Sequence, residues 1–423
     1  MGRADMRGAR SSVQRVDSIS AGDEWVAVGE APPPAWRLAP RRWGHSLHSM
    51  CSYMAMFPPT LPHTFIRWLT EPGEVVYDPF SGRGTTVLEA CQLGRVGLAS
   101  DASPLAWVLS GAKAQPPSLS AVANRIADLR RQYRAPSVSS VPEHVRILFD
   151  GRTLKQLVWL RRELGMGRRT DRYLMAVLLG ILHLNARKDG TPRGLSVSMP
   201  NTFSMAPGYV SRYVKTHRLE PPRVDVFDAL EARVAALGTV GEGFRAGRVW
   251  QQDVCNRIRW PQGTDKAALV FTSPPYLEVM RYGKLNWLRL WMLGQEPKAV
   301  DERLFASASL PRYLDFMRET LNSIRPCVRE DGYVCLVIGD VRRGEEQINL
   351  AGEVARQCLD GTGFRVLEVV DDHLPVEHKV SRIWGETKGR ATKVERILIL
   401  GAPKARRLPR VPRIEWTKSG ERT

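Results

Sequence analysis

The feature that most constrains the fold is an apolar strand followed by a glycine loop, a helix and a second strand. The β-rich segment VVYD at 75–78 leads directly into the loop DPFSGRGTT at 78–86. We expect a helix over 85–94 and a second strand over 95–101. A strand–helix–strand unit of this kind predicts parallel strands in a sheet that carries helices on its faces.

The same alternation returns in the second half of the chain. A helix is expected over 310–328, among β-rich segments that lie at 247–253, 267–273, 332–340, 364–372 and 394–401. This order predicts a mainly parallel sheet covered on both faces, so the fold class is α/β and Rossmann-like. We expect the segment at 394–401 to be the final edge strand.

The stretch at 118–245 has a different pattern, which is typical of a mainly helical insertion. We expect one helix with Ser120 as its N-cap and a strongly apolar helix over 171–188. The residues at 189–219 mix Gly, Pro, Arg, Lys and Tyr and are expected to form a loop. Such a loop fits either a nucleic-acid contact or an ordinary connection.

These patterns divide the chain into five predicted segments. They are a disordered or loosely attached basic segment at 1–43, an α/β unit at 44–117, the helical insertion at 118–245, a second α/β unit at 246–402 and a basic tail at 403–423.

The net charge of +18 favours a polyanionic partner, and nucleic acid above all. The plainer alternative is an arginine-rich composition that reflects only the base content of the genome. Both ends of the chain are rich in arginine. They fit mobile arms that contact phosphates, or arms that only keep the protein in solution.

Targeting and metal-binding signals are missing from the sequence. No apolar run reaches the roughly 18 residues that a membrane helix needs, and the N-terminus lacks the apolar core of a secretory signal. The six cysteines form no Cys-x-x-Cys pair, and no histidine lies beside them at zinc-ligand spacing. We therefore expect a cytoplasmic protein with no membrane contact, no metal site and buried free thiols.

The loop at 78–86 has the features of a nucleotide-cofactor site. Its glycines allow a tight turn and close approach of a ligand, and the following helix offers free N–H groups. Asp101 ends the next strand and is placed to hold ribose hydroxyls, while Asp253 could accept an adenine amine or act only as a cap. The loop lacks both the Gly-Lys-Ser/Thr ending of a phosphate loop and the Gly-x-Gly-x-x-Gly pattern expected for NAD.

The segment TSPPY at 272–276 follows an apolar strand, and its Pro-Pro pair ends the strand and fixes the backbone. An aromatic amine is a poor nucleophile because its lone pair is delocalised into the ring. The Ser273 hydroxyl and the Pro274 carbonyl are suited to accept the two amine hydrogens and to orient the lone pair. Tyr276 can stack on a base that has left its duplex.

Together, DPFSGRGTT and TSPPY resemble the amino-methylating (N4-cytosine/N6-adenine) DNA methyltransferase superfamily, in its SPPY form. The resemblance implies S-adenosyl-L-methionine as the cofactor and double-stranded DNA as the partner. It also implies a Rossmann-like methyltransferase sheet with its cofactor-binding half at 44–117, its catalytic half at 246–402 and target-recognition elements in the insertion. The predicted catalytic residues are Ser273, Pro274, Pro275 and Tyr276. The predicted cofactor-binding residues are Phe57, Pro58, Asp78, Pro79, Phe80, Ser81, Gly82, Gly84, Thr85, Thr86, Asp101 and Asp253.

Ser273 favours cytosine N4 as the target, because adenine enzymes of this family more often carry Asp or Asn at that position. Three alternatives stay open: methylation of adenine N6, methylation of an RNA or tRNA base, and a degenerate DNA-binding module without activity. A C5-cytosine mechanism is disfavoured, because the dipeptide Pro326-Cys327 lies in a helical, arginine-rich context. The resemblance implies a bacterial protein, nucleoid-associated when bound to DNA, with a restriction endonuclease as a candidate counterpart.

Overall fold

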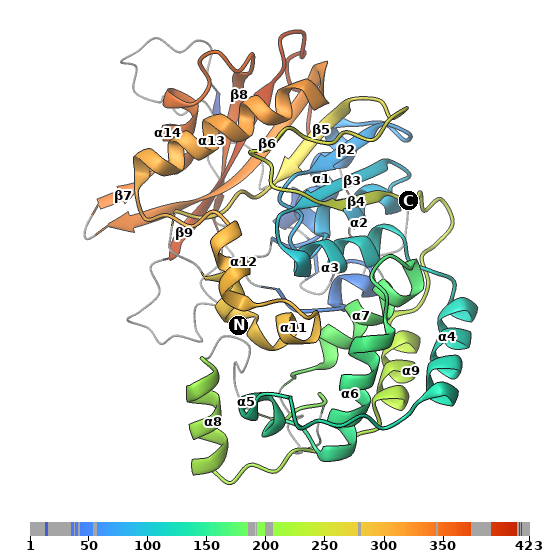
Figure 1. Cartoon of the computed structure of the whole chain (residues 1–423). Helices are drawn as coiled ribbons and strands as arrows, with labels where there is room; N and C mark the ends of the chain where they lie inside the picture. The colour runs from blue at the N-terminus through green and yellow to red at the C-terminus, as the bar shows by residue number, and fades with distance from the viewer. Residues whose placement is uncertain are drawn as a thin grey trace, which may run out of the picture.

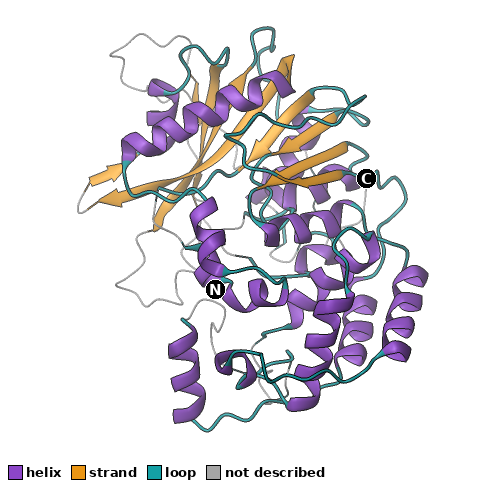
Figure 2. Cartoon of the chain, viewed as in Figure 1, coloured by secondary structure: helices purple, strands orange, loops and turns teal. Residues whose placement is uncertain are grey.

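The computed structural model describes residues 13–15, 35–37, 39–40, 43–53, 57–184, 191, 193–198, 206–277, 281–343, 346–373, 391–412, 414 and 416. A sheet with helices against it forms one part of the molecule, and a helical unit lies beside this part (Figure 1). Figure 2 separates the two parts by colour, since the strands are confined to the first of them.

The strands are β1 (Val13–Arg15), β2 (Val75–Asp78), β3 (Val96–Asp101), β4 (Arg248–Gln251), β5 (Ala267–Thr272), β6 (Val328–Arg343), β7 (Glu346–Ile348), β8 (Arg365–His373) and β9 (Ala391–Gly401). The α-helices are α1 (Thr60–Leu69), α2 (Thr85–Gln92), α3 (Pro104–Ala114), α4 (Leu119–Gln132), α5 (Glu143–Arg146), α6 (Gly151–Glu163), α7 (Arg169–Ile181), α8 (Pro207–Thr216), α9 (Val226–Leu237), α10 (Tyr282–Leu285), α11 (Trp287–Met292), α12 (Pro297–Arg303), α13 (Leu310–Ile324) and α14 (Leu350–Gln357).

The sheet has the order β1-β8-β9-β6-β5-β2-β3-β4, with β7 paired to β6. Strands β4, β3, β2, β5 and β6 run parallel, whereas β9 is antiparallel to both of its neighbours. The chain order reverses between β2 and β5, and ligands of open α/β sheets bind at the carboxyl ends of strands at such a point. The predicted α/β, Rossmann-like fold is confirmed.

The prediction that 394–401 is an edge strand is wrong. Strand β9 lies between β6 and β8 and pairs with both. Its four residues from Ile397 to Leu400 are all buried, so side chains on both faces of the strand are covered. An uninterrupted apolar run is typical of an interior strand, and this is the reason for the difference.

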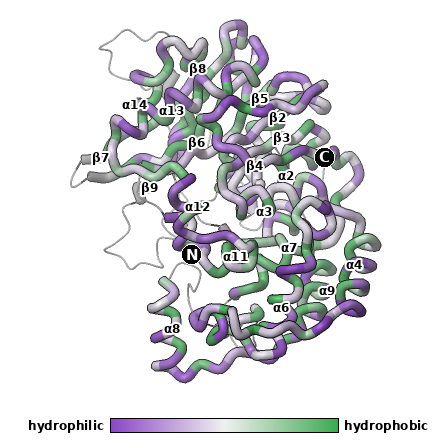
Figure 3. Tube along the Cα trace, in the orientation of Figure 1, coloured by the Kyte–Doolittle hydropathy of each residue, from purple (hydrophilic) through white to green (hydrophobic). Residues whose placement is uncertain are grey.

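Different helices cover the two faces of the sheet. Val76 and Leu269 face α1 and pack in one cluster with Phe65. Tyr77, the next residue along β2, points to the opposite face and packs in another cluster with Met317 of α13. Successive side chains of a strand alternate between faces, so each short strand contributes to both cores. All residues of β2 and β5 are buried, and Figure 3 colours the chain by the hydropathy of each residue.

The helical unit has one continuous apolar core. Helices α4 to α9 contribute to it, together with α3 of the first α/β unit. Leu47 and Met50, which precede the first parallel strand, also belong to this core, as do Trp287 and Met292 of α11. The unit is therefore built from three stretches of the chain that are far apart in sequence.

Two local predictions in this unit are corrected. The N-cap of α4 is Ser118, whose hydroxyl accepts from the Ala121 amide at 3.3 Å, so the assignment of Ser120 is wrong. Part of the segment expected to be a loop forms α8, because Val210 and Val214 lie one turn apart and both are buried. The predicted apolar helix at 171–188 corresponds to α7, and its last four residues lie outside the described part of the chain.

Described pieces of both chain ends are attached to the sheet. Strand β1 pairs with β8, and the indole of buried Trp36 donates to Asp372 at 3.0 Å. In the C-terminal segment, Ala402 and Ala405 are buried, and the Trp68 indole donates to the Pro409 carbonyl at 2.9 Å. The described cations of this tail are exposed on an attached segment, which differs from the expected mobile arm.

Within the described residues, no helix is long and apolar enough to cross a membrane, and no group of His, Cys, Asp and Glu side chains is arranged to hold a metal ion. Five of the six cysteines are buried, as expected for free thiols, and Cys255 is half-buried.

Candidate active site

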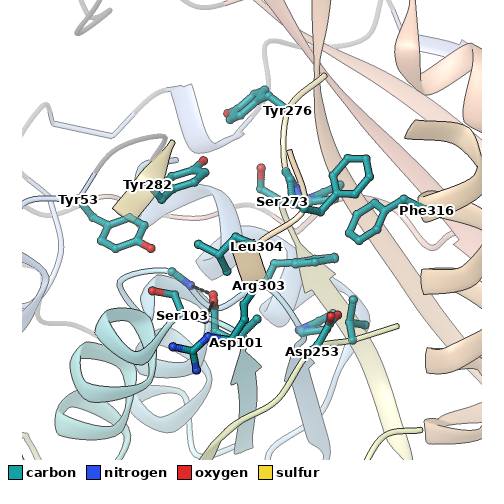
Figure 4. A pocket seen from close by; sticks show the side chains of 18 residues that line it. Tyr53, Asp101, Ser103, Asp253, Ser273, Tyr276, Tyr282, Arg303, Leu304 and Phe316 are labelled. Atoms are coloured by element: carbon teal, nitrogen blue, oxygen red, sulfur yellow. Dashed lines mark hydrogen bonds between the residues drawn. The ribbon is translucent and has the colours of Figure 1, made fainter. Parts of the chain in front are cut away.

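A pocket lies at the carboxyl ends of β2, β3, β4 and β5, where the chain order reverses (Figure 4). Two predicted site segments that are almost 200 residues apart in sequence come together here. The predicted residues that line the pocket are Pro79, Phe80, Gly82, Asp101, Asp253, Ser273, Pro274, Pro275 and Tyr276.

Asp101 lies on the floor of this pocket and is held by two main-chain amides. Its carboxylate accepts from the Gly82 amide and from the Ser103 amide, both at 2.9 Å. Burial raises the pKa of Asp101 to about 6, and the charge of nearby Asp253 adds to the rise. The two carboxylates come from the ends of neighbouring strands, and Figure 4 places both on the same side of Ser273.

Asp78 is turned away from the pocket. It is buried, and its carboxylate accepts from the Thr272 hydroxyl at 2.6 Å and from the Phe80 amide at 3.2 Å. Burial raises the pKa of Asp78 to about 7. In this position Asp78 joins the glycine loop to the end of the catalytic strand β5.

The glycine loop needs both of its glycines. Gly82 and Gly84 have φ values of +49° and +78°, which lie in the left-handed region that favours glycine. A Cβ at Gly84 would lie 2.7 Å from the Ser110 Cα, so the loop approaches α3 more closely than any side chain allows. A Cβ at Gly82 would lie 3.5 Å from the Tyr53 ring, which is an ordinary contact.

A buried lysine of α3, Lys113, is hydrogen-bonded to the main chain of the same loop. The Lys113 ammonium donates to the Arg83 carbonyl at 2.6 Å, and burial lowers the pKa of Lys113 well below its usual value. The Arg83 guanidinium donates in turn to the His48 carbonyl at 3.1 Å. These contacts fix the loop to α3 and to the segment that precedes α1.

The catalytic segment is anchored to β6. The Ser273 hydroxyl donates to the Val337 carbonyl at 3.0 Å, and Pro274 is buried. A Cβ at Gly339 would lie 3.1 Å from the Tyr276 ring, so the missing side chain makes room for that ring. Burial raises the pKa of Tyr276 above its ordinary value, and the charge of Glu395 adds to the rise, so the phenol stays neutral.

The remaining predicted residues support the pocket without lining it. Phe57 packs edge-on against Phe271 of β5, with ring centroids 5.6 Å apart, and Pro58 is exposed. The Ser81 hydroxyl accepts from the Ser110 hydroxyl at 3.0 Å. Thr85 and Thr86 are buried in the first turn of α2.

The other side chains that line the pocket were not predicted from the sequence. Three of them lie beyond the catalytic segment, in α12 and the loop after it. The unpredicted lining side chains include Tyr53, Tyr282, Arg303, Leu304, Phe305 and Phe316. The rings of Tyr53 and Tyr282 are stacked with their centroids 6.4 Å apart, and those of Phe305 and Phe316 are stacked with their centroids 4.0 Å apart. Phe316 lies on the buried face of α13, and the apolar periodicity of 310–328 was the sequence signal that could have indicated its burial.

The raised pKa of Asp78 gives a stability test. Unfolded Asp78 loses its proton near pH 4, whereas folded Asp78 keeps it up to about pH 7. The folded state therefore binds more protons in this window, and the Asp78 contribution to stability falls as the pH rises through it. The variant Asp78→Asn keeps an acceptor for Thr272 and removes this titration. We expect its melting temperature relative to the wild type to rise from pH 4 to pH 7. Parallel profiles from thermal melts of the two proteins would contradict the assignment.

Comparison with known proteins gives one sequence match. Residues 18–104 match the model of a DNA methylase family. No curated protein matches the chain.

Three similar solved structures have low scores. TrmN from Thermus thermophilus is 10% identical, with a TM-score of 0.31, and the match covers 84% of this chain and 52% of TrmN. The rRNA methyltransferase aviRa from Streptomyces viridochromogenes is 12% identical, with a TM-score of 0.32, and the match covers 84% of this chain and 90% of aviRa. A protein from Thermus thermophilus described as a DNA modification methylase, in complex with S-adenosyl-L-methionine, is 22% identical, with a TM-score of 0.20, and the match covers 35% of this chain and 51% of that protein. The match spans about half the length of TrmN. Scores this low carry no argument, and the observed sheet order establishes the fold by itself.

Proposed function

This chain belongs to the amino-methyltransferase superfamily, as its two motifs predicted, and from that premise we propose that it methylates the exocyclic N4 amine of cytosine in double-stranded DNA. S-adenosyl-L-methionine is confirmed as the cofactor by the same family match. The cytosine target, the DNA substrate and a restriction endonuclease counterpart are parts of the proposal.

The hydrogen bond from Ser273 to Val337 carries the proposal. A serine hydroxyl has one proton to donate and two lone pairs that accept. The Ser273 proton is directed to the Val337 carbonyl and the Tyr276 phenol is a second hydrogen-bond partner of this hydroxyl, so one lone pair of its oxygen is left for a donor in the pocket. An exocyclic amine offers two such hydrogens, and the Pro274 carbonyl is the second acceptor.

Two fixed acceptors change the reactivity of the amine. They bind both hydrogens and hold the nitrogen so that its lone pair is directed out of the plane of the base. The Pro-Pro pair and the anchor on β6 hold the acceptors before the base arrives, so little ordering remains to be done in the reaction.

The residues around the glycine loop fit the cofactor. Gly82 and Gly84, whose positive φ values let the loop turn tightly, add no side chain beside the pocket, and the helix that follows presents its free amides. Asp101 and Asp253 would hold the ribose hydroxyls and the adenine amine. Bound there, S-adenosyl-L-methionine supplies an electrophilic methyl group on its sulfonium.

Aromatic side chains at the pocket are suited to hold a base. The target base must leave the duplex to reach Ser273, and the lost stacking can be replaced by protein side chains. Tyr276, Tyr53 and Tyr282 surround the Ser273 side of the pocket (Figure 4). Contacts of this kind are worth about 1–3 kcal/mol per base.

The preference for cytosine rests on the chemistry of Ser273. A hydroxyl is a small, neutral acceptor, whereas the adenine enzymes of the family more often place a carboxylate or an amide there. A pyrimidine is also smaller than a purine, which suits a pocket narrowed by the Tyr53–Tyr282 pair and by Phe305.

The test is mass spectrometry of nucleosides from duplex DNA that has been incubated with the protein and S-adenosyl-L-methionine. We expect N4-methylcytosine without N6-methyladenine. N6-methyladenine alone would overturn the choice of base and leave the acceptor mechanism intact. A product on tRNA or rRNA with none on DNA would overturn the substrate. Binding of DNA without any methylated product would favour the degenerate module.

A further inference from the structure

A second hollow lies behind one wall of the catalytic pocket. It is open, has a volume of about 820 Å³ and lies between the helical unit and the helices α10 to α12. The two hollows share this wall: Tyr282 and Arg303 line the catalytic pocket, while Arg281 and Lys284 line the second hollow. A molecule bound in the second hollow would therefore lie across this wall from a base held in the catalytic pocket.

The cations of this hollow are available to a ligand. Arg161, Arg281 and Lys284 line it, are exposed, and form no ion pair with any other described residue. Surface cations of a folded protein without such partners are free to bind phosphates.

The acidic side chains of the hollow are mostly engaged elsewhere. The Asp301 carboxylate accepts from the amides of Gly283 and Lys284 at 2.6 and 3.1 Å, which fixes α12 to α10. Glu302 lies 3.9 Å from the Lys298 ammonium. Glu296 is the third carboxylate among the described lining residues, and Asp301 keeps its negative charge when it accepts from amides. With the Lys298–Glu302 pair counted as neutral, three cations face two carboxylates, which leaves a net positive charge.

The hollow is also built on rigid elements. The Arg161 guanidinium lies over the Trp291 ring, 5.4 Å from its centroid, which holds the side chain of this cation in place. Trp287 is buried and packs edge-on against His144 at 5.3 Å. A cation that is already held in place, as Arg161 is, loses little entropy when it binds a ligand.

We propose that this hollow, here called the basic groove, binds the sugar–phosphate backbone of DNA next to the base held in the catalytic pocket. The inference rests on the proposed function, because it assigns a second part of the same substrate. Phosphate contacts position a protein on a duplex and carry no sequence information. The basic groove therefore sets the register of the flipped base, and the sequence is recognised elsewhere.

The test compares two double variants of the full chain. Arg281→Ala with Lys284→Ala removes two cations from the basic groove. Arg312→Ala with Lys266→Ala removes two exposed cations from outside it. Binding of a fluorescent DNA duplex is measured by anisotropy over a range of salt concentrations, and S-adenosyl-L-methionine binding is measured by calorimetry as a check on folding.

Each phosphate contact contributes about 0.9 to the slope of log K against log salt. We expect the salt dependence of the groove variant to become shallower, with the magnitude of its slope smaller by about 1.8, because two contacts are lost. The slope of the control should equal that of the wild type. Cofactor affinity should be unchanged in both. If the alanine pair does not fold, the pair Arg281→Gln with Lys284→Gln keeps the side-chain length and gives the same comparison.

The outcomes separate this inference from the proposed function. Equal slopes for the groove variant and the control would overturn the basic groove, while methylation of DNA by both would leave the function standing. No binding of DNA by the wild type would overturn the function itself. A slope change seen with an RNA duplex and not with DNA would overturn the DNA assignment of the groove.

Discussion

Replacement of Ser273 by alanine is expected to slow methyl transfer by about 100-fold or more while leaving cofactor binding unchanged. The hydroxyl is one of two acceptors for the amine, and removal of one preorganised hydrogen-bonding group from a transition state typically costs about 10²–10³ in rate. The Ser273 side chain is small and lies at the surface of the pocket, so its loss leaves the packing of β5 and β6 in place. Single-turnover kinetics and calorimetric titration of S-adenosyl-L-methionine measure the two quantities.

A matched serine separates this effect from a general loss of stability. Ser323 also donates from its hydroxyl to a main-chain carbonyl, that of Asn256 at 3.2 Å, but lies on α13 outside the pocket. Ser323→Ala should keep wild-type turnover, and Ser273→Thr should retain part of the rate because it keeps the hydroxyl. Wild-type turnover in Ser273→Ala would refute the acceptor role.

The second large effect is expected at Gly84. The variant Gly84→Ala places a Cβ 2.7 Å from the Ser110 Cα, a separation that side chains do not reach, so the loop must move away from α3. The Gly82 amide, which donates to Asp101, lies in this loop and would move with it. We expect S-adenosyl-L-methionine affinity to fall by about 100-fold or more, because a displacement of an ångström is enough to lose such a factor. Calorimetry gives the affinity.

Gly238 provides the control for this variant. Its φ of +63° is positive like the +78° of Gly84, but its ψ of −159° lies in a region that is essentially limited to glycine, and a Cβ there would meet nothing within 4 Å. Gly238→Ala therefore carries at least as much backbone strain without the steric clash, and its cofactor affinity should match the wild type. A similar loss in both variants would mean that strain, and not the approach of the loop to α3, explains the effect.

The sequence predicted the sheet and the meeting of the two motifs well. Strand, loop and helix signals are local, and β2, α2 and β3 begin and end within two residues of their predicted bounds. Parallel strands bring their carboxyl ends to one edge, so Asp101, Asp253 and Ser273 could be expected together before their contacts were known.

What the sequence could not predict depends on long-range packing. The direction of the Asp78 side chain is decided by Thr272, nearly 200 residues away, which provides a buried donor for its carboxylate. Likewise, Tyr53 and Arg303 carry no motif, and they reach the pocket only because the helical unit packs against the sheet. The apolar run of β9 is a signal for an interior strand, but it does not specify that β6 and β8 are its neighbours.

The core of the helical unit limits how this unit can be exchanged between related proteins. Because Leu47, Met50, Trp287 and Met292 complete this core from outside the insertion, a transplant of 118–245 alone would carry an apolar surface without its natural cover. Residues 118–245 alone therefore lack part of the core of the helical unit. A chimaera that exchanges this unit with that of a relative must transfer all three stretches together, or redesign the surface where they meet.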